Sequence, residues 1–429
     1  MTKISAKKTP CLVLALIGLC LGIATESYPQ VPLPDDIVLT PPSANVPADI
    51  AIFAGAWGGD AWGGTLPHVL VVERVNSDGT AEAVYAYGNN TNGTIKAGWR
   101  RYTGIISNGR LHFVFPSGPV IDYTVNKDGS LFGRYVFREM PSYVRLTRIA
   151  GNDATTVIAA AAKPIKTAWE EISIPEDSKV GETTGKTLAL QAILFRTPLT
   201  GRRPVIIFNH GSTGPGIIPA NMFPDFARKN NAARTFLSLG YTVVLPMRKG
   251  FGKSEGPIIE EQPGSTTTQD VQLNSAVEDL DAVVDYMKAQ PYVDPTRIIV
   301  AGQSRGGMLA VVYAGRHPDK VDGVINFSGG WWAERVPTAD FNVLQFGQAG
   351  RTATIPMLWL YADHDTLYSL AYIEQAFAAF RAAGGNGQLF EVRDLPGNGH
   401  FLSAWPDKWQ DVAATYLKNL EKSAGQAGH

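Results

Sequence analysis

The sequence predicts an α/β domain, with a mostly parallel sheet flanked by helices, preceded by a small antiparallel β domain. Residues 50–149 contain short runs of alternating hydrophobicity separated by turn sequences such as Asn108-Gly109, a pattern typical of antiparallel strands. From residue 167 onward, strand-like apolar runs alternate with helical ones, which is typical of a sheet wrapped by helices. Within this second part, a glycine-rich turn at residues 302–307 lies between a strand pattern and a helix pattern.

Length and composition describe an ordinary globular protein. The chain has 429 residues, enough for two globular units, and 45% hydrophobic residues with 18% charged residues provide a substantial core. The formal net charge is -1, and Lys and Arg are not clustered. The sequence therefore indicates neither a nucleic-acid partner nor an anionic membrane surface as a partner.

Residues 1–24 have the pattern of a signal peptide. A basic start precedes the apolar run 11–23, which is short for a membrane span, and cleavage is expected after the small residue Ala24. A lipid anchor on Cys20 is an alternative, but Leu19 is a poor residue before such a cysteine. Both cysteines fall in this segment, so the mature chain would contain neither a disulfide nor a thiolate nucleophile. We expect export to the periplasm or the medium, without membrane association after cleavage.

The β domain is expected at residues 50–149, after an extended, proline-rich lead-in at residues 25–49. Its strand spacing suits a barrel or a sandwich, lipocalin-like in its up-and-down order. The aromatic residues Trp57 and Trp62 near its start would either cradle a ligand or pack inside the barrel. Packing is favoured, because aromatic side chains in small barrels usually belong to the core.

The α/β domain is expected at residues 167–425, after an alanine- and threonine-rich linker at residues 150–166. Its glycine-rich turn reads G-x-S-x-G, with Ser304 at the centre. Such a turn raises the serine hydroxyl above the sheet, at the N-terminus of the next helix, where N–H groups favour an oxyanion. The alternative is an ordinary strand-to-helix turn with an incidental serine.

A serine nucleophile needs a base and an orienting acid, and in such a sheet these are expected after later strands. His400 lies on a glycine-flanked loop after one such strand and is the predicted base. Asp363 and Asp365 both follow the strand pattern at 357–361, so either is a candidate acid. His364 lies between them, but nothing in the sequence supplies the further ligands of a metal site.

An oxyanion needs two N–H donors. One is expected from Arg305, the residue after the serine. The other is expected from Ser212, in the glycine-containing loop after the strand at 205–209. His210 precedes this loop and is expected to brace it, because a triad uses one base.

These residues resemble the α/β-hydrolase superfamily over residues 169–420, and within it the dienelactone hydrolase and prolyl oligopeptidase catalytic-domain groups. The resemblance rests on His210-Gly211, on Arg248 to Gly256, on Asp294 to Arg297 leading into Gly302 to Gly307, and on Gly399-His400.

The acid pattern Gly-x-x-Asp of these groups has Ala362 in place of its glycine here and implies Asp365 as the acid, with Asp363 as the alternative. Lys249, inserted between Arg248 and the next glycine, departs from their usual Arg-Gly pattern. Dienelactone hydrolases usually have a cysteine nucleophile where this chain has serine, so the resemblance does not imply lactone specificity.

Taken together, the sequence and the resemblance predict an exported serine hydrolase that cleaves small carboxylic esters without cofactor or metal. Ser304 is the expected nucleophile, and Trp331 and Trp332 either line the substrate pocket or pack beneath their loop. One alternative is a serine peptidase of the prolyl oligopeptidase type, although the hundred residues of the β domain are too few for that group's β-propeller. Another is a non-catalytic ligand-binding protein on a hydrolase scaffold. The sequence makes no prediction of the oligomeric state.

Overall fold

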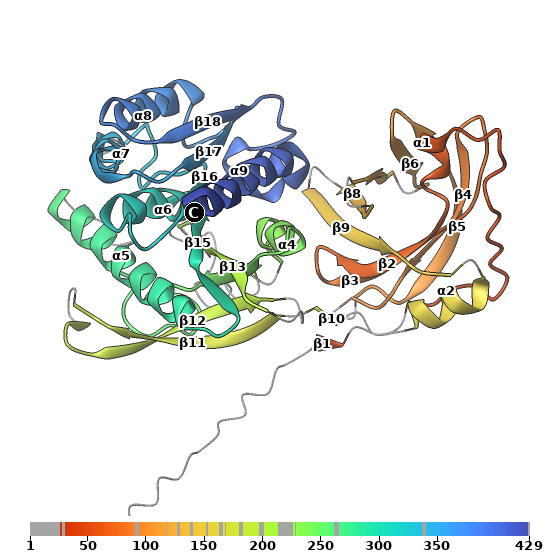
Figure 1. Ribbon diagram of the computed structural model, residues 1–429, viewed down its shortest axis with the longest axis horizontal. Coiled ribbons are helices and arrows are strands. Elements are labelled where there is room, and N and C mark those ends of the chain that lie inside the picture. The colour runs from red at the N-terminus through yellow and green to blue at the C-terminus, as the bar shows by residue number, and fades with distance from the viewer. Residues whose placement is uncertain are drawn as a thin grey trace, which may run out of the picture.

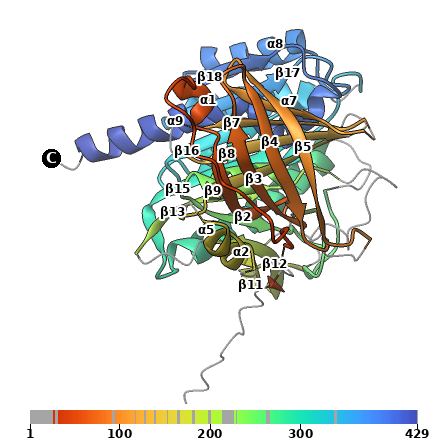
Figure 2. The same cartoon turned by 90° about the vertical axis from the view of Figure 1, so that its right-hand side faces the viewer.

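The computed structural model places two bodies side by side, a β-barrel and an α/β domain (Figures 1 and 2). It describes residues 26–27, 31–90, 94–116, 118–126, 129–137, 140–151, 153–162, 166–167, 169–179, 183–196, 201–212, 226–227, 229–260, 266–336 and 340–427. The expected signal peptide, with both cysteines, lies outside these residues. Within them, no helix has the length and apolar character that crossing a membrane requires.

The N-terminal body is a closed barrel in which each strand pairs antiparallel with the next and the last pairs with the first. This is the up-and-down barrel that the strand spacing suggested, rather than a sandwich. Its strands are β2 (Gly55–Trp62), β3 (Leu66–Val75), β4 (Thr80–Tyr87), β5 (Gly98–Ser107), β6 (Arg110–Val114), β7 (Val120–Val125), β8 (Leu131–Phe137) and β9 (Met140–Arg148).

The barrel core is apolar and rich in aromatic side chains. Trp57 is fully buried and packs in the core as expected, and its indole Nε1 donates to the carbonyl of Phe53 at 3.0 Å. Trp62 is also buried in this cluster. A short helix, α1 (Ala48–Ala51), precedes β2, and its neighbours pack against the same core.

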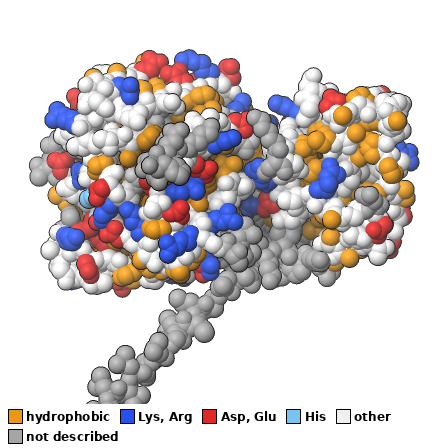
Figure 3. Space-filling view, in the orientation of Figure 1, with side chains coloured by type: hydrophobic (Ala, Val, Ile, Leu, Met, Phe, Trp, Pro, Cys, Tyr) orange, Lys and Arg blue, Asp and Glu red, His pale blue; other side chains and the backbone are white. Residues whose placement is uncertain are grey.

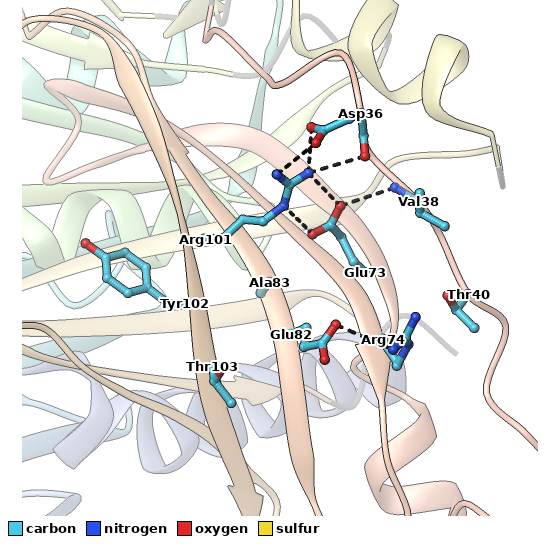
Figure 4. Close-up of a pocket in the computed structure, with 10 residues that line it drawn as sticks. All are labelled: Asp36, Val38, Thr40, Glu73, Arg74, Glu82, Ala83, Arg101, Tyr102 and Thr103. Carbon is cyan, nitrogen blue, oxygen red and sulfur yellow. Dashed lines mark hydrogen bonds and ion pairs between the residues drawn. The ribbon is translucent and has the colours of Figure 1, made fainter.

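The lead-in is held against the barrel by an ion-pair network. Arg101 on β5 donates to Asp36 at 2.7 Å and to Glu73 at 2.9 Å, and Glu73 also accepts from the backbone N–H of Val38 at 3.2 Å (Figure 4). These residues line a cleft of about 370 Å³ between the lead-in and the barrel. Because the charged side chains of the cleft pair with one another, they hold the lead-in against the barrel.

The expected linker contains a helix, α2 (Ala154–Ala161). The side chain of Asp153 caps it by accepting from the N–H of Thr156 at 2.9 Å, and Val157 and Ala161 bury one face against the outside of the barrel. Nothing in the sequence indicated this helix, because an i, i+4 pair of small apolar residues is too short a pattern to stand out.

The C-terminal body has a sheet of eight strands in the order β11-β12-β14-β13-β15-β16-β17-β18. Strands β11 and β12 form an antiparallel hairpin, β12 pairs antiparallel with β14, and the rest of the sheet is parallel. The strands are β11 (Trp169–Asp177), β12 (Thr187–Phe195), β13 (Arg203–Asn209), β14 (Thr242–Pro246), β15 (Val293–Gln303), β16 (Gly323–Phe327), β17 (Met357–Ala362) and β18 (Gly387–Val392). A two-residue pair, β1 (Glu26–Ser27) with β10 (Lys166–Thr167), lies beside it.

Helices cover both faces of this sheet. Those on one face, where they share one buried cluster, are α5 (Thr266–Lys288), α6 (Arg305–Arg316), α7 (Asp340–Thr352) and α8 (Leu370–Ala382). Those on the other face are α4 (Asn231–Ser238) and α9 (Pro406–Ala427), with the 3₁₀ helix η3 (Gly399–Ala404) before α9. Figure 3 shows acidic and basic side chains interspersed over the face in view, in keeping with the near-zero net charge.

The barrel packs on α4 and on the start of α9. Asp60 of β2 forms an ion pair with Arg234 of α4, and the Tyr143 hydroxyl of β9 donates to Asp407 of α9. The guanidinium of Arg134 lies 3.5 Å from the Asp407 carboxylate. The barrel therefore contacts the first turn of α9, the helix that directly follows η3.

A buried cluster of charges joins β11, α5 and the loop after β14. The ammonium of Lys249 contacts Asp279 at 2.7 Å, Glu278 at 2.9 Å and also Glu176. One cation thus faces three carboxylates in a buried position. Burial and the negative charge of Asp279 outweigh Lys249 and raise the pKa of Glu176 to about 8.

The raised pKa of Glu176 predicts a pH dependence of stability. Between its ordinary value of 4.5 and about 8, the folded protein holds a proton that the unfolded chain has released. The free energy of unfolding should therefore fall as the pH rises through this window. Glu176→Gln should leave Tm nearly unchanged at pH 5 and raise it above that of the wild type at pH 8.5, as measured by thermal denaturation.

The matched control is Glu171→Gln, on the same strand but in an exposed ion pair with Lys253. Its Tm should run parallel to that of the wild type at every pH. If the Glu176→Gln curve also ran parallel, Glu176 would not be the group that takes up the proton.

Candidate active site

Ser304 lies between β15 and α6 in a strained backbone conformation, with φ 58° and ψ -125°. A Cβ atom at Gly302 would overlap the backbone of Gly306, and one at Gly306 would overlap the carbonyl of Asn209. The Ser304 N–H donates to the carbonyl of Phe327 at 2.9 Å. The glycines of G-x-S-x-G are therefore required by the close approach of β13 and α6, and they leave the serine at the helix N-terminus.

His400 is buried in η3 and is oriented by a carboxylate. Its Nδ1 lies 3.1 Å from Oδ2 of Asp365. The other oxygen of Asp365 accepts backbone N–H groups from Leu367 at 2.7 Å and Tyr368 at 3.1 Å. Asp365 is thus fixed by its own loop, so that its Oδ2 faces the imidazole.

Asp363, the alternative acid, has a different set of partners. Its two oxygens accept the backbone N–H groups of Asp394 at 2.7 Å and Leu395 at 3.3 Å. It therefore joins the loop after β17 to the loop after β18. Of the two aspartates, Asp365 is the one whose carboxylate contacts His400 in the part of the chain that the structure describes.

The loops that carry the three predicted catalytic residues meet at the carboxyl ends of the strands. Gln303, next to the serine, donates through Nε2 to the carbonyl of His400 at 2.9 Å. A Cβ at Gly211 would lie 3.1 Å from the Cβ of Ser304, so the loop after β13 passes directly over the serine. Both Ser304 and His400 are buried, 7% and 6% exposed.

The two predicted N–H donors lie on the loops that meet here. Arg305 is the first residue of α6, where the N–H groups of a helix are directed toward its N-terminus. Ser212 follows Gly211, the residue packed over Ser304. The two loops are therefore close enough to share one site, and the roles of Ser212 and Arg305 as oxyanion donors remain predictions.

His210 braces the loop that leads to Ser212. Its Nδ1 lies 2.7 Å from the carbonyl of Gly211, and its Nε2 accepts from the backbone N–H of Arg248 at 3.3 Å. Burial and the charge of Arg248 hold the pKa of His210 well below its ordinary value. A neutral imidazole with its proton on Nδ1 satisfies both contacts.

Arg305 and the two tryptophans pack on one another. The guanidinium of Arg305 is buried, 5.2 Å from the ring of Trp331 and 5.0 Å from that of Trp332. Trp331 is only 2% exposed and belongs to the core cluster, so its placement supports the packing alternative. Trp332 is half-buried, and its role as a pocket residue remains a prediction.

Sequence reasoning missed two residues that support His400. Asn398 accepts the His400 N–H at 3.0 Å and the Thr366 N–H at 3.2 Å, so it joins the loops of the acid and the base. The ring of Tyr368 lies 5.6 Å from the imidazole. An asparagine two residues before the histidine was the available signal, because asparagine often binds nearby backbone N–H groups in this way. Among the described residues, no group of three or more His, Cys, Asp or Glu could hold a metal ion.

Comparisons with known proteins agree with this fold. Residues 204–352 match the family model described as alpha/beta hydrolase fold. NocK of Nocardia uniformis subsp. tsuyamanensis, which is named as an esterase, is 35% identical over 86 residues. That alignment covers 20% of this chain and 22% of NocK, so the chain spans about a fifth of this relative's length.

Two solved structures match this chain in part. A dienelactone hydrolase structure from Klebsiella pneumoniae is 19% identical with a TM-score of 0.39, and the match covers 58% of this chain and 98% of that one. A dipeptidyl aminopeptidase IV structure from Bacteroides ovatus is 15% identical with a TM-score of 0.44, and the match covers 82% of this chain and 50% of that one. Similarity at this level says nothing of activity. The parallel sheet and the helices on both of its faces agree with the family match over residues 204–352, so the C-terminal domain of this chain has the α/β-hydrolase fold.

Proposed function

We propose that this protein is a serine hydrolase that cleaves carboxylic esters through an acyl-enzyme. The observation that carries the proposal is the pairing of His400 Nδ1 with Asp365, on a loop that is bonded through Gln303 to the turn holding Ser304 at the N-terminus of α6. With Nδ1 bound to the carboxylate, Nε2 is the ring nitrogen that remains to accept the proton of Ser304. The set contains a nucleophile, a base and an orienting acid.

The chemistry follows from these roles. His400 takes the proton of Ser304 as the hydroxyl oxygen attacks the ester carbonyl, and Asp365 stabilises the imidazolium that forms. The N–H groups of Ser212 and Arg305 would bind the oxyanion of the tetrahedral intermediate. The imidazolium then protonates the leaving alcohol, and the acyl-enzyme is hydrolysed by a water molecule that His400 activates.

The test is a pair of measurements on the full chain. A fluorophosphonate probe should label the wild-type protein on Ser304, as located by peptide mass analysis. The protein should also hydrolyse nitrophenyl esters of short acids much faster than aminoacyl arylamides. Absence of labelling would favour a non-catalytic binding protein, and a preference for arylamides would favour a peptidase.

We also propose that the protein is exported. The support is the basic start, the apolar run 11–23 and the small residue Ala24. Expression of the full chain in a bacterial host should yield a mature form beginning at Thr25, detected by N-terminal sequencing of the periplasmic fraction or medium. A full-length cytoplasmic product would contradict the export proposal.

A further inference from the structure

A hydrogen-bonded chain of buried side chains connects the two loops that the proposed oxyanion hole would use. It contains Arg248, in the loop after β14, and Glu260, twelve residues further on. Their side chains are 2% and 5% exposed. Neither residue takes part in the proposed chemistry, and the sequence did not point to Glu260.

Arg248 holds the first loop. Its Nη1 donates to the carbonyl of His210 at 2.8 Å, while its backbone N–H donates to Nε2 of the same histidine. His210 in turn contacts the carbonyl of Gly211, which packs against Ser304. Backbone, imidazole and guanidinium therefore fix the residue that immediately precedes the Gly211-Ser212 pair.

Glu260 connects this loop to the serine turn. Its carboxylate accepts two parallel bonds from Arg248, at 2.7 Å from Nε and 2.9 Å from Nη2. Its backbone carbonyl accepts from Nη1 of Arg305, whose N–H is the other predicted donor. Glu260 is thus bound through its side chain to Arg248, which holds the loop of His210, and through its backbone carbonyl to Arg305, which follows Ser304.

The backbone next to Arg248 is also fixed in place. The next residue, Lys249, donates its backbone N–H to Asp279 at 2.8 Å and forms the buried ion pairs described above. The other side of the Arg305 guanidinium is also fixed, because its Nε donates to the carbonyl of Trp331 at 3.2 Å. Both ends of the chain are therefore anchored in the body of the domain.

From these contacts we infer that Arg248 and Glu260 are positioning residues that hold the Ser212 and Arg305 N–H groups at the spacing needed to bind one oxyanion. The inference rests on the proposed function. A two-pronged pair between a guanidinium and a carboxylate fixes angle as well as distance, which a single bond does not. Misplacing one oxyanion donor weakens transition-state binding with little effect on substrate binding.

The experiment uses Glu260→Gln in the full chain. The substitution keeps the size of the side chain and the backbone carbonyl, but it removes the charge and one of the two acceptors facing Arg248. We expect kcat for a nitrophenyl ester to fall about 10- to 100-fold with KM nearly unchanged, somewhat less than the loss of an entire oxyanion donor. A trifluoromethyl ketone, which forms a tetrahedral oxyanion on the serine, should lose affinity by the same factor.

Two further variants separate positioning from stability. Arg248→Lys keeps the charge but cannot form the two-pronged pair, and it should show the same pattern if Glu260→Gln does not fold. Glu73→Gln breaks a comparable arginine–carboxylate pair in the barrel, where Glu73 is 11% exposed, and it should lower Tm while leaving kcat and ketone affinity unchanged.

The outcomes are distinct. A folded Glu260→Gln or Arg248→Lys enzyme with wild-type kcat and ketone affinity would overturn this inference and leave the proposed function standing. So would a loss that appears in KM alone. A wild-type protein that neither hydrolyses esters nor reacts with the fluorophosphonate probe would overturn both.

Discussion

Ser304→Ala is expected to lower kcat/KM for a nitrophenyl ester by about 10⁴- to 10⁶-fold, because the attacking oxygen is removed and only binding and the oxyanion donors remain. The fold should be retained, since alanine meets the positive φ of this position no worse than serine does. Steady-state kinetics with Tm as the check on folding would measure this. Labelling by the fluorophosphonate probe should disappear with the activity.

Ser328→Ala is the matched control for this prediction. Ser328 is also buried, also has a positive φ of 44°, and lies just beyond β16, the neighbour of β15. Its hydroxyl donates at 3.3 Å to the carbonyl of Gly399. Loss of this hydroxyl should lower kcat/KM by less than about tenfold, as expected for one weak neutral hydrogen bond. Equal losses in the two variants would mean that Ser304 is structural and that the nucleophile lies elsewhere.

The parts of the fold that the sequence predicted are those with a local, repeated signal. Alternation with period two and turn pairs such as Asn108-Gly109 predicted an antiparallel barrel or sandwich, and the structure is a barrel that closes through β9 on β2. The G-x-S-x-G turn could be predicted because close backbone contacts, at Asn209 and at Gly306, leave room only for glycine at its two ends, which produces a recognisable local pattern. The strand pattern and the glycines before His400 predicted a loop position for it after β18. The structure places it there in the 3₁₀ helix η3, and its role as the base stays a prediction.

What the sequence missed depends on partners distant along the chain. The Arg305 side chain is buried between Trp331, Trp332 and the carbonyl of Glu260, all of which are more than twenty residues away along the chain. The pairing of Arg248 with Glu260 has no periodicity or spacing that would reveal it. In the sequence Lys249 is only an insertion into a family pattern. The structure shows that it pairs with three carboxylates, which lie far from it along the chain.

The choice between Asp363 and Asp365 shows the same limit and leads to the second large prediction. Both follow one strand, two residues apart, so pattern alone leaves them equivalent. Asp365→Asn should lower kcat about 10⁴-fold with little change in KM. The amide oxygen would keep the backbone N–H groups of Leu367 and Tyr368, which leaves the NH₂ group facing Nδ1 of His400. The imidazole would then carry its proton on Nε2 and could not accept one from Ser304.

Asp363→Asn is the matched comparison, with the same change of atoms two residues away. Its carboxylate serves the N–H groups of Asp394 and Leu395, so the substitution should weaken the contact between two loops and lower Tm. Its effect on kcat should stay below about tenfold, the range of one weakened structural hydrogen bond. If Asp363→Asn were the inactive variant and Asp365→Asn the active one, the acid would be reassigned. The 3.1 Å contact between His400 and Asp365 would then have to break in the working enzyme, because an imidazole that accepts the serine proton needs its Nδ1–H held by whichever carboxylate acts as the acid.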